Sequence, residues 1–111
     1  MNIIKIQEKQ AIEKLIQSGK EFISLLDINH LSVEIYKPNL VDKQSPHDRD
    51  EFYIIIAGNG TFELDGKTTS VQKGDFLFVP AFIDHRFIEF SDDFTTWVFF
   101  INSDTYELDR Q

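Results

Sequence analysis

The residues of this sequence best suited to bind a metal ion are His47, Glu51 and His85. The chain has three histidines and no cysteine, so any metal site must combine imidazole nitrogens with carboxylate or carbonyl oxygens. The remaining histidine, His30, begins a strand after the turn-forming residues 27–29 and has no carboxylate or second histidine at a suitable spacing. We therefore expect a solvated or turn-capping role for His30.

His47 and Glu51 can share one ion only if the chain turns between them. In one straight strand, four steps of about 3.3 Å would separate them by roughly 13 Å, which is too far. Residues 48–50 have the sequence Asp-Arg-Asp and form a suitable hairpin loop, because aspartate tolerates turn dihedral angles. Such a hairpin places His47 opposite Glu51, and the loop before His85 can direct the second imidazole to the same point. The result is a predicted site of two imidazoles and one carboxylate.

One short helix and about eight short strands are predicted to carry these residues. Apolar residues within 7–17 have helical spacing, and Gly19 is a suitable C-terminal stop. Asp65-Gly66 is a strong signal for a two-residue hairpin. Runs of β-forming residues occur near 21–26, 31–37, 51–57, 61–65, 67–72, 76–79, 85–90 and 95–102. Short strands without alternating helices predict an antiparallel all-β sandwich or barrel.

The composition is that of one acidic globular domain spanning residues 1–111. Hydrophobic residues make up 41% of the chain and include 11 phenylalanines, enough for a sizeable core. The net charge of -8 disfavours nucleic acid and anionic membranes as partners. The N-terminus is too polar for the core of a signal peptide, and no apolar run approaches membrane-spanning length, so we expect a cytoplasmic protein.

Strand parity identifies surfaces that need a cover. In residues 52–56, Phe-Tyr-Ile-Ile-Ile, both parities are apolar, so we expect both faces of this strand to be covered. A second subunit would provide the outer cover, which predicts a homodimer, and the helix packed on the sheet is the competing explanation. Parity also places four candidate pocket-wall residues on the faces of Glu51 and His85, namely Tyr53, Ile55, Phe87 and Glu89.

Motif spacing across most of the chain resembles the cupin superfamily. His47, Glu51 and Gly58 match the later half of its first motif, and Gly74, Pro80 and His85 match its second motif. The stretch 33–100 also resembles small single-domain cupins, with PHDRDEFY at 46–53, GDFLFVPA at 74–81 and HRF at 85–87. The resemblance implies a double-stranded β-helix, a jelly-roll-like barrel with one short N-terminal helix. It also implies a divalent metal ion on His47, Glu51 and His85, for which two imidazoles and a carboxylate favour iron, with manganese, nickel and zinc left open.

Four positions depart from the family pattern, and one of them separates two functional hypotheses. Asn39, Ser45, Phe82 and Glu89 stand where the motifs have Gly, His, Gly and Asn. Gln44, Ser45 or water would have to complete the coordination shell. The first hypothesis is a metal-dependent enzyme, dioxygenase-like or isomerase-like, acting on a small organic molecule. The alternative is a non-catalytic cupin that binds a small ligand and has lost full metal competence, and Ser45 is the residue that favours it.

Overall fold

The computed structural model describes residues 2–102 and contains one helix and eight strands. This element order confirms the helix and all eight strands predicted from the sequence. The elements are α1 (Glu8–Ser18), β1 (Phe22–Ile28), β2 (Leu31–Tyr36), β3 (Asp50–Ala57), β4 (Asn59–Leu64), β5 (Lys67–Gln72), β6 (Phe76–Val79), β7 (His85–Phe90) and β8 (Thr95–Ile101).

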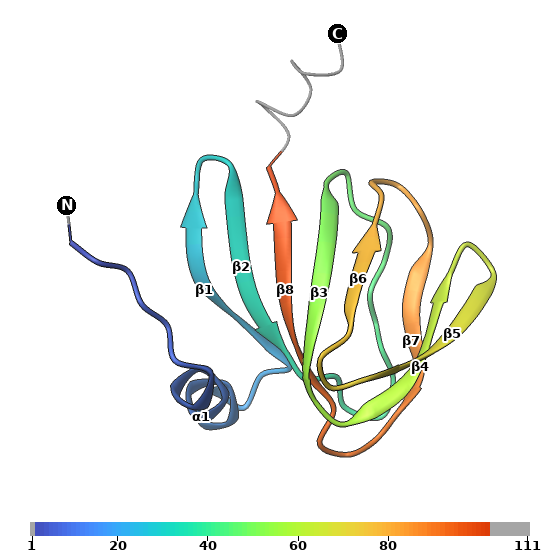
Figure 1. Cartoon of the computed structure of the whole chain (residues 1–111), viewed down its shortest axis with the longest axis horizontal. Helices are drawn as coiled ribbons and strands as arrows, with labels where there is room; N and C mark the ends of the chain where they lie inside the picture. Colours follow the sequence, from blue (N-terminus) through green and yellow to red (C-terminus); the bar gives the residue numbers. More distant parts are fainter. Residues whose placement is uncertain (1, 103–111) are drawn as a thin grey trace, which may run out of the picture.

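The strands form two antiparallel sheets. The larger sheet has the order β1-β2-β8-β3-β6, and the smaller sheet has the order β5-β4-β7 (Figure 1). One hydrophobic cluster draws residues from both sheets, so the sheets pack against each other. Within the part of the chain that the structure describes, β6 pairs only with β3 and β5 only with β4. The sheets are therefore not closed into a hydrogen-bonded barrel, in contrast to the sequence-based expectation.

The core between the sheets is mainly aromatic. Tyr53, Phe87 and Phe94 are almost completely buried, and their rings meet at centroid distances of 5.1 Å for Tyr53–Phe87 and 4.7 Å for Phe87–Phe94. Edge-on and tilted ring pairs of this kind contribute about 0.5–1.5 kcal/mol each beyond the area they bury. The large phenylalanine content is thus used to fill the space between two short sheets.

The helix packs on the outer face of the larger sheet. Ala11 and Leu15 are 1% exposed and form a second cluster with Ile35 and Ile56. Gly19 ends the helix in the left-handed conformation, as its sequence position predicted, and its N–H donates to the carbonyl of Ile16. The helix therefore explains why Ile56 is apolar, without a second subunit. No helix in residues 2–102 is long and apolar enough to cross a membrane.

Two turns set the path of the chain between the sheets. Asp65 and Gly66 both have positive φ, 50° and 80°, which confirms the predicted tight hairpin between β4 and β5. Gly58, also at φ 80°, leads from β3 into β4 and so from one sheet to the other. A Cβ atom on Gly58 would lie 2.5 Å from Oγ of Ser91 and 2.7 Å from Cα of Phe94. Only glycine fits this crossing.

A bulge in β7 makes one of the parity predictions wrong. Tyr53, Ile55 and Phe87 are buried between the sheets, as predicted. Phe62 pairs with Phe87 but Thr61 pairs with Glu89, so the register shifts by one residue. Because the extra residue reverses the side-chain alternation, Glu89 is exposed and accepts a hydrogen bond from the Thr61 hydroxyl. Glu89 therefore does not share the face of His85.

Candidate metal centre

His47, Glu51 and His85 converge on one point between the two sheets. Glu51 lies near the start of β3 in the larger sheet, and His85 is the first residue of β7 in the smaller sheet. His47 comes from the irregular segment before β3. One ligand atom from each residue lies within 4.8 Å of the others. Oε1 of Glu51 is 2.5 Å from Nε2 of His85 and 3.7 Å from Nε2 of His47.

The polar atoms at this point are buried and lack hydrogen-bond partners. Glu51 is 0% exposed and His85 is 5% exposed. Among residues 2–102, no hydrogen bond of acceptable geometry satisfies Nε2 of His47, Nε2 of His85 or either carboxylate oxygen of Glu51. Buried polar groups are normally paired, because an unpaired one costs about 1–3 kcal/mol. Four such atoms facing one another are the donor set that a divalent cation requires, so the residues present fit a metal ion.

The orientation of His85 is fixed by a backbone carbonyl. Nδ1 lies 2.8 Å from the carbonyl oxygen of Ile83. Since a carbonyl only accepts, Nδ1 carries the proton and Nε2 is directed at Glu51. Burial acts to lower the pKa of His85, but the Glu51 carboxylate and the Ile83 carbonyl outweigh it and raise the pKa above the ordinary 6.5. Without a metal, His85 therefore favours the imidazolium form beside a carboxylate.

His47 is placed by the loop before β7, and the predicted hairpin at residues 48–50 is wrong. Residues 48–49 form a bend, and the carbonyl of His47 accepts a hydrogen bond of 2.6 Å from the N–H of Phe82. The imidazole meets the ring of Phe100 edge-on at 5.1 Å. Burial lowers the pKa of His47, so its ring is neutral near neutral pH. The sequence thus predicted that His47 lies beside Glu51, but the contact that holds it comes from a distant loop.

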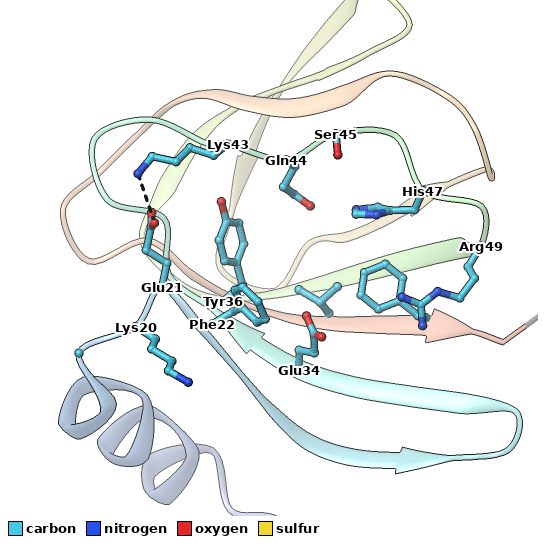
Figure 2. A pocket seen from close by; sticks show the side chains of 13 residues that line it. Lys20, Glu21, Phe22, Glu34, Tyr36, Lys43, Gln44, Ser45, His47 and Arg49 are labelled. Atoms are coloured by element: carbon cyan, nitrogen blue, oxygen red, sulfur yellow. Dashed lines mark ion pairs between the residues drawn. The ribbon is translucent and has the colours of Figure 1, made fainter.

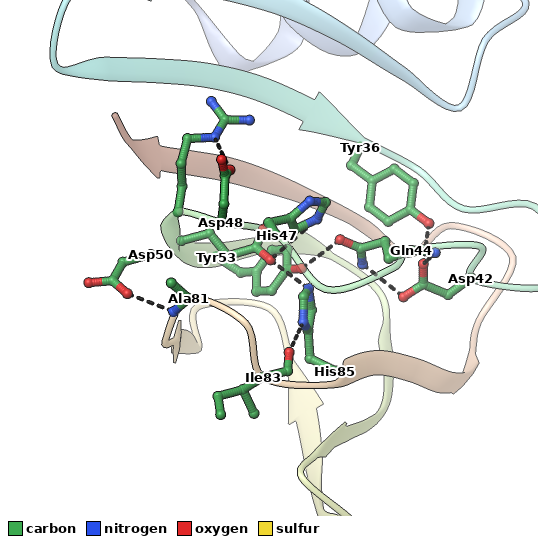
Figure 3. A network of polar contacts seen from close by, with 12 residues as sticks. Tyr36, Asp42, Gln44, His47, Asp48, Asp50, Tyr53, Ala81, Ile83 and His85 are labelled. Carbon is green, nitrogen blue, oxygen red and sulfur yellow. Dashed lines mark hydrogen bonds and ion pairs between the residues drawn. The ribbon is translucent and has the colours of Figure 1, made fainter. Parts of the chain in front are cut away.

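Asp42 is a buried hub that sequence analysis did not identify. Its carboxylate accepts hydrogen bonds from the Tyr36 hydroxyl and from the backbone and side chain of Gln44 (Figure 3). It also accepts one from the backbone N–H of Phe87. The segment that carries His47 is therefore tied to β7, which carries His85. Nothing in the local sequence distinguishes Asp42 from a solvated loop aspartate, because its donors Tyr36 and Phe87 lie on strands, six and 45 residues away.

The amide of Gln44 is used within this network. Its Oε1 accepts a 2.8 Å hydrogen bond from the hydroxyl of Tyr53, and its Nε2 donates to Asp42. Burial raises the pKa of Tyr53 well above its ordinary value, so the phenol stays protonated and acts as the donor. Gln44 and Ser45 were the two side chains considered for completing a coordination shell, and within residues 2–102 only the hydroxyl of Ser45 makes no such hydrogen bond.

Asp50 shows why loop aspartates cannot be assigned from sequence. Sequence analysis placed it in the loop between His47 and Glu51, where an aspartate is expected to be solvated, but it is 1% exposed and its Oδ1 accepts a 2.7 Å hydrogen bond from the N–H of Ala81. It therefore anchors the loop that leads to His85. Asp48, two residues earlier, does have the expected exposure, at 76% of its side chain.

Comparison with known proteins identifies the family. The pattern of the cupin domain family matches residues 32–101, and the chain belongs to this family. An uncharacterized protein of Streptomyces coelicolor is 29% identical over 102 residues, which cover 90% of this chain and 95% of that protein.

Solved structures show the same fold. A cupin with a double-stranded β-helix fold from Methanocaldococcus jannaschii has a TM-score of 0.63 at 17% identity, covering 79% of this chain and 84% of that one. The DMSP lyase DddQ of Ruegeria pomeroyi has a TM-score of 0.61 at 19% identity, covering 75% of this chain and 47% of that one. The two facing sheets are therefore the double-stranded β-helix of cupins, as the sequence motifs implied.

Phe82 provides a test of how the centre is held. Its ring is 72% exposed, yet its backbone has φ 69°, a left-handed conformation that costs roughly 1–2 kcal/mol for a residue with a side chain. We expect Phe82→Gly to raise the free energy of unfolding by about 1 kcal/mol, because glycine adopts this conformation without strain. Phe82→Ala, which also removes the ring but keeps Cβ, is the matched control and should give no such gain. Urea denaturation of the three proteins checks this, and equal stability of the Gly and Ala variants would contradict it.

Proposed function

We propose that this cupin binds a divalent metal ion through His47, Glu51 and His85 and acts with it on a small organic molecule. The observation that carries the proposal is the convergence of four buried nitrogen and oxygen atoms that make no hydrogen bonds within the described residues. Two imidazoles and one carboxylate suit divalent iron, and the same donors also accept manganese, nickel or zinc.

The protein's own residues prepare this site for chemistry. A bound divalent ion supplies a Lewis acid that polarises an oxygen atom of a ligand. Ile83 holds the tautomer of His85, and the buried ring of Phe100 lies against His47 and limits the access of water. Three protein ligands leave open positions, which an enzyme of the dioxygenase or isomerase type needs for its substrate.

A second candidate is a cupin that binds a small ligand without turning it over. Ser45, which stands where the first cupin motif has its leading histidine, is exposed and supplies a hydroxyl where the family has an imidazole. A three-ligand centre holds an ion less tightly than a four-ligand one, so this substitution favours a binding role. Stoichiometric metal in the purified protein would favour the first candidate.

Elemental analysis of the protein purified without chelator or added metal tests the site. We expect about one divalent ion per chain, lost in both His47→Ala and His85→Ala, because each variant leaves only two ligands. His30→Ala, which removes an exposed histidine from another part of the chain, is the matched control and should keep its metal. Metal content that is the same in all four proteins would rule out this centre.

The pH dependence of metal binding follows from the state of His85. A metal ion and a proton compete for Nε2, and the pKa of His85 lies above 6.5. Affinity should therefore be highest at alkaline pH and should fall as the pH drops through this pKa, approaching about tenfold per pH unit below it. Calorimetric titration of chelator-treated protein with Zn²⁺ at pH 8, 7 and 6 measures the effect. An affinity that is constant across these pH values would contradict the assignment of His85 as a ligand.

We also propose that the chain forms a homodimer through the outer face of its larger sheet. On the edge strand β6, Phe76 is 59% exposed and Phe78 is 47% exposed. Phe52 stacks on Phe99 at 4.6 Å and meets Phe76 at 5.3 Å, so the exposed rings extend an aromatic surface across three strands. The helix covers only the other part of this face. A second copy offers an identical surface, and burying both would remove the apolar edge from water.

Light scattering at micromolar concentration tests the dimer. We expect a mass twice that of the 13.0 kDa chain, and we expect Phe78→Lys to give a folded monomer, because it places a charge in the contact. Ile28→Lys, which changes a similarly exposed apolar residue on the opposite edge strand, β1, is the matched control and should leave the dimer intact. A monomeric native protein would reject the interface.

A further inference from the structure

A cavity of about 560 Å³ opens beside the metal centre. His47 is part of its wall, so a molecule in this cavity would lie next to the three candidate ligands. Val98 and Phe100 of β8 line it with apolar surface. Glu34 of β2 and Arg49 also lie at its wall (Figure 2). This cavity has the size of a small organic ligand and combines an apolar surface with a few polar groups, which is typical of binding sites.

Basic side chains outnumber the acidic ones, Glu21 and Glu34, around the cavity, in a chain whose net charge is -8. Three basic side chains line it, those of Lys20, Lys43 and Arg49. Lys43 is already paired with Glu21 at 3.7 Å. Because Arg49 alone among the three is also fixed by contacts on two sides, it is the cation best placed to recognise a ligand.

The guanidinium of Arg49 is held in place while keeping donors for a ligand. Its carbon lies 4.2 Å from the centroid of the Phe100 ring, and Nη1 donates a 3.0 Å hydrogen bond to Oδ1 of Asn102. Its contact with Asp48 is 4.0 Å long, and the Asp48 side chain is 76% exposed, so solvent screens this pair. Arginine has five N–H donors, and a fixed guanidinium binds a planar carboxylate through two of them.

Glu34 also lines the cavity and interacts electrostatically with Arg49, without a direct ion pair between the two side chains. Its carboxyl group makes no hydrogen bond and no ion pair within 4.0 Å with any residue in the range 2–102. Burial raises the pKa of Glu34 and disfavours its charged form, while the nearby charge of Arg49 acts to lower this pKa. Arg49 is thus oriented, incompletely neutralised and directed to a cavity with an apolar floor.

We propose that this cavity binds a small organic acid, with the ligand carboxylate on Arg49 and its apolar body on Val98 and Phe100. The inference rests on the proposed function, because it names the ligand class of the same centre. It also makes Arg49 a specificity-determining residue that is separate from the three metal ligands. A ligand held in this way presents its remaining atoms to the side of the cavity formed by His47.

Benzoate and benzamide are suitable probes, because they share shape and apolar area and differ in charge. Binding of each is measured by calorimetry or by NMR titration, first on chelator-treated protein and then on protein loaded with Zn²⁺. The variants are Arg49→Gln and Lys9→Gln, which each remove one positive charge, the second from the exposed face of α1 outside the cavity. Arg49→Lys keeps the charge and loses the planar fork, and it replaces Arg49→Gln if the latter fails to fold.

In chelator-treated protein we expect benzoate to bind more tightly than benzamide, and to bind about tenfold more weakly to Arg49→Gln than to the native protein or to Lys9→Gln. Benzamide should bind the three proteins equally. Benzoate affinity that is the same in Arg49→Gln and Lys9→Gln would overturn the inference. Benzoate that binds only after Zn²⁺ loading, with no effect of Arg49, would also overturn it while leaving the metal centre intact. Failure of the metal centre appears separately, as protein that takes up no Zn²⁺.

Discussion

A carboxylate buried between two imidazoles is the constraint on which the rest of this structure depends. Glu51 has no exposed surface, and an isolated charge in such a place costs several kcal/mol unless a cation compensates it. The neighbouring His85 supplies one when protonated, and a divalent ion would supply a stronger one. Either compensation lowers the cost of packing the two sheets around Glu51, so the fold and the chemistry of the centre are coupled.

A second buried carboxylate keeps the parts of the centre together. Asp42 collects donors from β2, from the segment before His47 and from β7, and thereby joins the carriers of both imidazoles. Asp50 at the start of β3 accepts a hydrogen bond from Ala81 and so holds the loop that leads to His85. These acidic residues fill their acceptor sites with backbone and side-chain donors of the structural network, whereas Glu51 faces the two imidazoles. Asp42 and Asp50 therefore have a structural role, whereas Glu51 is a candidate metal ligand.

The cavity and the candidate metal centre are adjacent and share one residue. His47 belongs to both, because its imidazole lies beside Glu51 and also forms part of the cavity wall. Arg49 follows two residues later and is fixed on Phe100, so the same short bend carries a metal ligand and a cation that faces the cavity. One irregular segment therefore positions both a candidate metal ligand and a candidate ligand-binding cation. Contacts with the loop at residues 80–83 and with β8 hold this segment in place.

The sequence by itself determined the elements and the identity of the candidate ligands. Local patterns fixed the eight strands, the end of the helix at Gly19 and the turn at Asp65-Gly66, because each depends on residues close in the chain. Ligand types and their motif spacing likewise pointed to His47, Glu51 and His85. Only the tertiary structure decided how these residues meet. The bulge that turns Glu89 outward, the burial of Asp42 and Asp50, and the stacking of Arg49 all arise from partners distant in sequence, which no local pattern records.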